Sequence, residues 1–327
     1  MMMNTTVNTA APTLVLLGNL LVDDIVLADG RTLLGEPGGA LLHAALAASL
    51  WDARVGLVSV VGSDYPAIGL DALACRGIDL AGVRRLGRPG GRAWLLHEPS
   101  ARRVIHHLDV PSHAEVSPVA SDIPAAWLAA SGMHLAPMPL SRQAELAAAI
   151  TRSTTPEASG RSRRPFISLD PFEIIRDDTA AEWRGPLASV DAFFAGEDDL
   201  RLSGDAGLAL RDLAADRLRL LVLKQAERGG VVHDLQDGDR YAWEARADRV
   251  VDVTGAGDAF AGGFLAGWLT RGDVNLSLAQ GVVSASFALE DWGSRGLLRA
   301  TPQAARERLA TWFPEQALVV CPEAVAG

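Results

Sequence analysis

Short apolar runs alternate along the chain with longer stretches that are rich in alanine and leucine. Apolar runs bounded by turn residues are typical of buried strands, and the longer stretches have the apolar content of packed helices. This alternation predicts an α/β fold, in which a mostly parallel sheet has helices on its faces. The predicted strands are 14–19, 54–61, 132–137, 166–170, 190–196 and 218–225. The predicted helices are 39–51, 65–77, 141–150, 201–216 and 259–272.

Two segments interrupt this alternation. Residues 24–34 and 91–109 alternate apolar positions around turn residues, as β-ribbons do, and they predict a small sheet beside the main body. Residues 151–165 are polar and predict a mobile connection. We expect a single domain over 12–320, with the ribbons at about 24–36 and 91–109. Flexible tails are expected at 1–11 and 323–327.

Composition limits the classes of function. The 327 residues carry a net charge of −10 and are 49% hydrophobic, which suits a globular enzyme with a large core and not a nucleic-acid-binding protein. The two cysteines, Cys75 and Cys321, have neither disulfide-framework nor zinc-site spacing, so a reducing cytoplasm is expected. The apolar stretch at 13–22 meets two aspartates too early to span a membrane.

One motif suggests chemistry. VVDVTGAGDAFAGG at 250–263 runs from a strand-like segment through Gly-Ala-Gly-Asp into a helix. The small residues at 255–257 let backbone N–H groups converge at the helix N-terminus, which is a ready anion site. Asp258 is then placed to take a proton from an attacking hydroxyl group. The alternative is a plain tight turn, with Asp258 stabilised by the helix dipole. The spacing alone leaves both open.

The motif also resembles a known family. DVTGAGDAFAGGFLAG is similar to the C-terminal signature of the ribokinase-like, or PfkB, carbohydrate kinases. GNLLVDD at 18–24, GEPGGALLHAALAASL at 35–50 and VSVVGSDYPAIGLDALACRGID at 58–79 resemble its other segments in the right order. The resemblance implies a doubly wound, mostly parallel sheet with helices on both faces. It also implies a small β lid, often used for dimerisation, so a homodimer through the lid is one expectation.

The resemblance implies transfer of the ATP γ-phosphoryl group to a hydroxyl of a small sugar, polyol or nucleoside. Asp258 would be the base, in front of an anion hole formed by the backbone of Gly255, Ala256 and Gly257. The residues implied at the acceptor are Asp23, Gly38, Gly39 and His43. His43 stands where the family usually has Asn, and a buried structural histidine is the alternative for it.

The resemblance also implies nucleotide and metal sites. Lys224, Arg228, Gly229 and Thr254 would face ATP, although Lys224 and Arg228 could equally face solvent. Gly196-Glu197-Asp198-Asp199 corresponds to the family's Asn-x-x-Glu motif, which makes Glu197 and Asp199 candidate Mg²⁺ partners; the alternative is a solvated helix start. Asp252 lies where many members place a monovalent cation, which would be K⁺.

Other hypotheses follow from the departures. A non-catalytic sugar- or nucleotide-binding homologue is the alternative function, because positions 196 and 43 differ from the family pattern. A nicotinamide-dependent dehydrogenase would need GxGxxG after the first strand, and the chain lacks it. His97, His106 and His107 on the second ribbon lack metal-ligand spacing and are expected at the lid surface.

Overall fold

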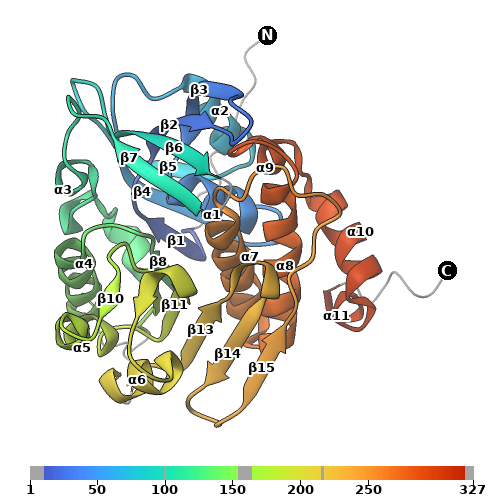
Figure 1. The fold of residues 1–327 in the computed structure, drawn as a ribbon. Coiled ribbons are helices and arrows are strands. Elements are labelled where there is room, and N and C mark those ends of the chain that lie inside the picture. Colours follow the sequence, from blue (N-terminus) through green and yellow to red (C-terminus); the bar gives the residue numbers. More distant parts are fainter. Residues whose placement is uncertain (1–10, 99–100, 154–163, 215–216, 321–327) are drawn as a thin grey trace.

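A nine-stranded sheet forms the centre of the computed structural model, which describes residues 11–98, 101–153, 164–214 and 217–320 (Figure 1). Its order is β15-β14-β13-β11-β9-β8-β1-β4-β5, parallel except for the antiparallel pairs that join β13, β14 and β15. The strands are β1 (Leu14–Leu17), β4 (Val55–Val61), β5 (Asp79–Arg85), β8 (Gly132–Leu135), β9 (Phe166–Leu169), β11 (Ala192–Gly196), β13 (Leu220–Lys224), β14 (Gly230–Asp234) and β15 (Arg240–Trp243).

Helices cover both faces of this sheet (Figure 1). Alternate residues of β1 divide between two hydrophobic clusters: Leu14 and Leu16 pack toward α1, α7 and α8, whereas Val15 and Leu17 pack toward α4 and α5. Successive side chains of a strand point to opposite faces, so the continuous apolar runs are those of strands buried on both sides. The helices are α1 (Ala40–Ala48), α2 (Ala67–Cys75), α3 (His113–Val116), α4 (Leu140–Arg152), α5 (Arg184–Leu187), α6 (Ala206–Leu213), α7 (Ala256–Arg271), α8 (Val274–Leu289), α9 (Arg295–Arg299), α10 (Pro302–Trp312) and α11 (Pro314–Val320).

The two ribbons form a separate four-stranded lid sheet of order β3-β2-β6-β7. It is mixed, because β2 and β6 are parallel while the outer pairs are antiparallel. Ile25, Leu27 and Leu95 make its own small hydrophobic cluster. Figure 1 shows the lid gathered at one end of the molecule. Its strands are β2 (Leu21–Val26), β3 (Thr32–Gly38), β6 (Arg92–Glu98) and β7 (Ala101–His106).

The expected fold class is therefore confirmed. The predicted elements do not include β5, β15 or α8, and those that were predicted differ at their boundaries. The predicted helix 201–216 is shorter: α6 begins at Ala206, since Gly204 has φ +78° and the Asp205 carboxylate caps the N–H of Leu208 at 3.0 Å. Ahead of it, β12 (Leu200–Arg201) pairs with β10 (Ile175–Arg176).

Some expectations fall outside the described ranges. These are residues 1–10 of the predicted tail at 1–11, the whole predicted tail at 323–327, and residues 154–163 of the polar connection. Among the helices that are described, none combines the length and apolar character needed to cross a membrane.

Candidate active site

The Gly-Ala-Gly-Asp motif forms the start of helix α7. Gly255 is the N-cap residue with φ +72°, and Ala256, Gly257 and Asp258 make the first turn. Early N–H groups of a helix lack partners within it, so this turn presents the positive end of a 16-residue helix. A Cβ atom at Gly255 would lie 2.1 Å from the His43 ring. Glycine is therefore required here both by backbone conformation and by space.

The loop before α7 is fixed by Asp252. Its Oδ1 accepts the N–H of Thr254 at 2.8 Å, and its Oδ2 accepts the N–H of Gly293 at 2.7 Å. The Nε2 atom of His97, from lid strand β6, lies 3.2 Å from Oδ1 and 3.4 Å from the Thr254 hydroxyl. A carboxylate only accepts, so Nε2 carries the proton in this contact. The expectation that His97 lies at the lid surface is wrong, because a distant loop covers it.

A cluster of charges lies beside the first turn of α7. Lys224, at the end of β13, has its Nζ 2.6 Å from Oδ2 of Asp170, at the end of β9. Burial raises the pKa of Asp170 to about 7, aided by repulsion from Asp258 and Asp199 and opposed by Lys224. Burial opposes the charge of Lys224, but the same three carboxylates prevail and raise its pKa. The cluster therefore has more carboxylates than cations and favours a further positive charge.

The acceptor residues implied by the sequence lie at the junction of lid and body. Asp23 of β2 is buried, and a Cβ atom on Gly38 would lie 1.8 Å from its Oδ2. Gly39 has φ +93° and faces the carbonyl of Asn19, which a Cβ atom would approach to 2.5 Å. His43 on α1 has its Nδ1 3.2 Å from the Gly39 carbonyl. Its buried Nε2 has no hydrogen-bond partner.

These groups enclose one cavity of about 630 Å³ between the lid, the carboxyl ends of the parallel strands and the start of α7. Such a position is where open α/β sheets bind ligands. Of the residues predicted from sequence, those lining it are Asp23, Gly39, His43, Asp199, Lys224, Thr254, Gly255, Gly257 and Asp258. The structure therefore brings both predicted halves of the site to one space.

Six predicted residues do not line the cavity. Glu197 pairs with Arg228 and both are exposed. Gly229 has φ +86° at the β13–β14 turn, where a Cβ atom would lie 2.0 Å from the Trp243 carbonyl. Gly38 and Asp252 support their neighbours Asp23 and Thr254, as described above. Ala256 likewise contributes only backbone, as part of the first turn of α7.

Sequence reasoning missed several lining residues, among them Asn19, Asp170, Phe172, His106 and His113. Asn19 and Asp170 are the last residues of the predicted strands 14–19 and 166–170, and polar residues at the carboxyl ends of parallel strands were the available signal. The two histidines and Phe172 carry no such signal. His107 stacks on Trp94, with ring centroids 5.2 Å apart, and contacts Asp24 at 3.1 Å. His106 is exposed, as expected for the lid surface, although it also lines the cavity, whereas His107 is half-buried within the lid.

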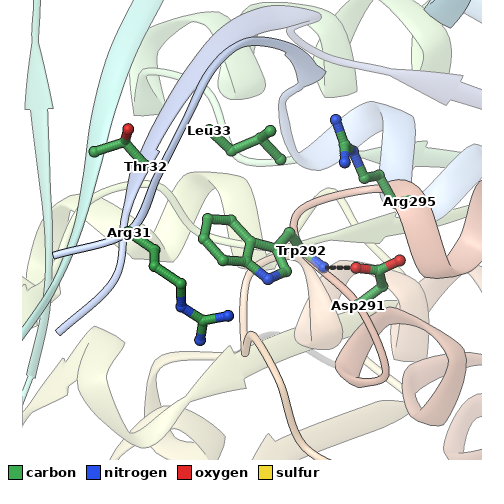
Figure 2. Close-up of a pocket in the computed structure, with 6 residues that line it drawn as sticks. All are labelled: Arg31, Thr32, Leu33, Asp291, Trp292 and Arg295. Atoms are coloured by element: carbon green, nitrogen blue, oxygen red, sulfur yellow. Dashed lines mark hydrogen bonds between the residues drawn. The ribbon is translucent and has the colours of Figure 1, made fainter. Parts of the chain in front are cut away.

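A second hollow of about 400 Å³ lies between β3 and the connection from α8 to α9 (Figure 2). Figure 2 shows Trp292 at its centre, with Arg31 and Leu33 on the lid side. The Arg31 guanidinium lies 5.1 Å from the Trp292 ring centroid. Trp292 packs on the lid's hydrophobic cluster, and the next residue, Gly293, donates to Asp252. This contact is a second link between the lid and the loop before α7.

Comparison with known sequences gives a family match. The model of the pfkB family carbohydrate kinases matches residues 20–300. The chain is 30% identical over 290 residues to the cytidine kinase of Thermococcus kodakarensis, an alignment that covers 86% of this chain and 97% of that protein. It is 28% identical over 282 residues to a fructokinase of Escherichia coli, covering 78% and 84% respectively.

The fold is also similar to solved structures. One is a protein of Escherichia coli described as a ribokinase II, in complex with ATP and Mg²⁺. The TM-score is 0.71 at 18% identity, over 91% of this chain and 99% of that one. At this identity the likeness concerns the fold alone.

Proposed function

This chain belongs to the pfkB family of carbohydrate kinases, and we propose that it transfers the γ-phosphoryl group of ATP to a hydroxyl of a small sugar, polyol or nucleoside. One observation carries the proposal. Asp258 and the N-terminal turn of α7 line the same cavity as Asp23 and Gly39 of the acceptor end. A base, an anion site and a hydroxyl-binding carboxylate thus share one space.

Asp258 acts as the general base. Its carboxylate takes the proton of the acceptor hydroxyl as that oxygen forms a bond to the γ-phosphorus, and the bond from this phosphorus to the β,γ-bridging oxygen breaks. The products are the phosphorylated acceptor and ADP. The N–H groups at Gly255, Ala256 and Gly257 hold the charge on the transferring group, and they cost no reorganisation because the helix fixes them.

Lys224 provides a further positive charge. Its Nζ would lie 3.4 Å from a Cβ atom on Gly257, so the ammonium stands beside the anion hole. The ion pair with Asp170 holds it in this place. We infer that Lys224 contacts the phosphates of the nucleotide, with Thr254 at the same wall of the cavity.

The cluster suits magnesium. Three carboxylates lie near one ammonium. Among the described residues no three acidic side chains are grouped to hold an ion by themselves, but Mg²⁺ is commonly bound by one or two carboxylates together with substrate phosphates. Asp199 would hold the ion, since it lines the cavity whereas Glu197 pairs with Arg228 outside it. When bound, magnesium supplies neutralisation of the phosphate charge.

The residues do not suit a monovalent cation at Asp252. Both of its oxygens already accept N–H groups, two from the backbone and one from His97. Oδ1 accepts two of these N–H groups and Oδ2 accepts the third, so most of the lone-pair sites of the carboxylate are occupied. We therefore assign no step to K⁺. The homodimer through the lid remains a prediction.

The test is purified protein with Mg-ATP and a panel of sugars, polyols and nucleosides. We expect ADP release that depends on one class of acceptor and falls by about 10²-fold or more in Asp258→Asn. Asp71→Asn, on exposed helix α2, is the matched carboxylate control. Binding of acceptor and ATP without any Asp258-dependent turnover would instead support the non-catalytic homologue.

A further inference from the structure

Several exposed apolar side chains line the cavity. Among the described residues, ten large hydrophobic side chains are exposed, and four of them line this one cavity: Val104 at 46%, Phe172 at 40%, Ile174 at 37% and Val253 at 50%. Leu95, which is buried, joins them at the lid side. Apolar surface concentrated in a concave site is favourable to cover, and it marks where a ligand has an apolar part.

Phe172 presents an aromatic face. One side of its ring is stacked by His113, with centroids 4.6 Å apart and planes inclined by 29°. Even with this neighbour 40% of the residue remains exposed, and it lines the cavity. Aromatic rings pair well in offset stacks, and base–aromatic stacking tolerates any heterocycle because each has a π face.

A series of hydrogen-bonded polar side chains, Asn19, His113 and His106, lies next to that ring. The Nδ2 atom of Asn19 lies 3.3 Å from Nδ1 of His113, and because an amide nitrogen only donates, Nδ1 accepts. Burial, with the nearby His106, lowers the pKa of His113 to about 4, so the ring is neutral at neutral pH and its proton is on Nε2. That N–H faces His106, whose ring meets it edge to face at 4.3 Å.

One hydrogen-bond acceptor in this series, on Asn19, has no donor. The Oδ1 atom of Asn19 is buried, has no hydrogen-bond partner, and belongs to a residue that lines the cavity and is 3% exposed. A buried polar atom without a partner costs about 1–3 kcal/mol, so the site gains when a ligand donor reaches it. The cavity lining thus offers the aromatic face of Phe172, apolar side chains and a hydrogen-bond acceptor on Asn19.

We propose, resting on the kinase function above, that the acceptor is a nucleoside whose base lies against Phe172 and bonds Asn19. The sugar then extends toward Asp23 and Asp258, which line the same cavity. A free pentose or hexose carries hydroxyl groups around its ring and would leave the apolar side chains uncovered. In a nucleoside, the base would cover the apolar side chains and the sugar would reach Asp23 and Asp258.

The test compares nucleosides with the matching free sugars. We measure kcat and KM with Mg-ATP for cytidine and inosine, as pyrimidine and purine probes, and for ribose and fructose. We expect at least one nucleoside to exceed both sugars in kcat/KM. Phe172→Ala lowers kcat/KM for that nucleoside by about tenfold or more through KM, and Phe172→Tyr restores it. Ile68→Ala, an apolar side chain 66% exposed on α2, is the control.

The outcomes separate this proposal from the kinase function. Preference for ribose or fructose, or a Phe172→Ala effect equal for nucleosides and sugars, overturns the nucleoside proposal and leaves the kinase function standing. If no acceptor is phosphorylated, calorimetry of the same nucleosides with wild-type and Phe172→Ala protein decides. Nucleoside binding weakened by Phe172→Ala supports the base site while the kinase function fails, and absence of nucleoside binding overturns the base site too.

Discussion

The lid residue His97 and the loop residue Asp252 are joined by a contact of 3.2 Å between Nε2 and Oδ1. The same ring nitrogen lies 3.4 Å from the hydroxyl of Thr254, which is 157 residues away in sequence. Asp252 in turn receives the backbone N–H groups of Thr254 and Gly293. The lid therefore helps to fix the loop that leads into the first turn of α7, where we propose the anion hole.

His97→Ala tests this link. Loss of the imidazole leaves one charged hydrogen-bond acceptor less satisfied, and such bonds contribute about 1.5–3 kcal/mol. We expect kcat to fall by about tenfold or more, with a smaller change in the KM for ATP, because the loop is misplaced for the reaction. Arg103→Ala on the same lid, whose exposed side chain pairs with Glu98, is the control. Equal kcat values for His97→Ala and the control would contradict the link.

Monovalent cations give a second prediction. Because three N–H groups already contact the Asp252 carboxylate, the rate with K⁺ should equal the rate with Na⁺ or with tetramethylammonium at constant ionic strength. The measurement is a titration of each chloride salt in the acceptor-dependent assay. Saturable activation by K⁺ alone would show that the carboxylate does hold a cation.

Two glycines of the motif make a matched pair. Gly255→Ala forces a side chain onto φ +72° and into the His43 ring, whereas a Cβ atom at Gly257 makes only an ordinary contact of 3.4 Å with Lys224. Gly255→Ala should lower the free energy of unfolding by about 1–2 kcal/mol or more, from backbone strain alone. Gly257→Ala should leave it within about 1 kcal/mol of wild type. Denaturant titrations measure the free energy of unfolding of both variants. Similar losses in the two would argue against backbone strain in Gly255→Ala.

Substitutions of Asp199 and of Glu197 should differ in their effect on the Mg²⁺ concentration that the reaction needs. Asp199 lines the cavity and also accepts the N–H of Gly196 at 2.7 Å, a bond that Asn can retain, whereas Glu197 pairs with Arg228. Asp199→Asn should therefore raise the Mg²⁺ concentration needed for half-maximal rate, and Glu197→Gln should leave it unchanged. The rate is measured against free Mg²⁺ at saturating ATP. A larger effect of Glu197→Gln than of Asp199→Asn on this Mg²⁺ concentration would instead place the metal at Glu197, outside the cavity.

Acid should destabilise the protein through His134. This histidine is buried on β8 with its Nδ1 2.9 Å from the Ser168 hydroxyl, and burial, with the charge of Lys224, lowers its pKa to about 3. The unfolded chain binds a proton below about pH 6.5 and the folded chain does not until about pH 3, so the free energy of unfolding falls as pH falls through this window. The slope for one such group is about 1.4 kcal/mol per pH unit.

Unfolding titrations from pH 7 to pH 4 measure this dependence. His134→Gln removes the group, so the variant should lose less stability per pH unit than wild type, although it starts less stable at pH 7. His113, with its lowered pKa, contributes in the same direction and remains in the variant. Parallel pH profiles for the two proteins would mean that His134 titrates normally when folded.

Local sequence determined much of this protein. The apolar runs placed the strands, since a strand buried on both faces has apolar residues at nearly every position, as β1 does with Leu-Val-Leu-Leu. The Gly-Ala-Gly-Asp motif likewise determined the start of α7, where we propose the anion site. A helix N-terminus, a positive φ at Gly255 and an adjacent carboxylate are all set within a few residues. Resemblance then joined Asp23 and Gly39 to that motif, and the cavity contains both.

Only the tertiary structure decided which side chains meet across the cavity. Asn19 and His113 are 94 residues apart, and the sequence around each of them does not predict their contact. His97 looked like a surface residue of a ribbon, yet the packing of the lid on the body brings it to Asp252. Glu197 and Asp199 looked equivalent, and the turn between β11 and β12 sends only Asp199 into the cavity. Such contacts depend on how separate elements pack, and local residue patterns carry no record of that packing.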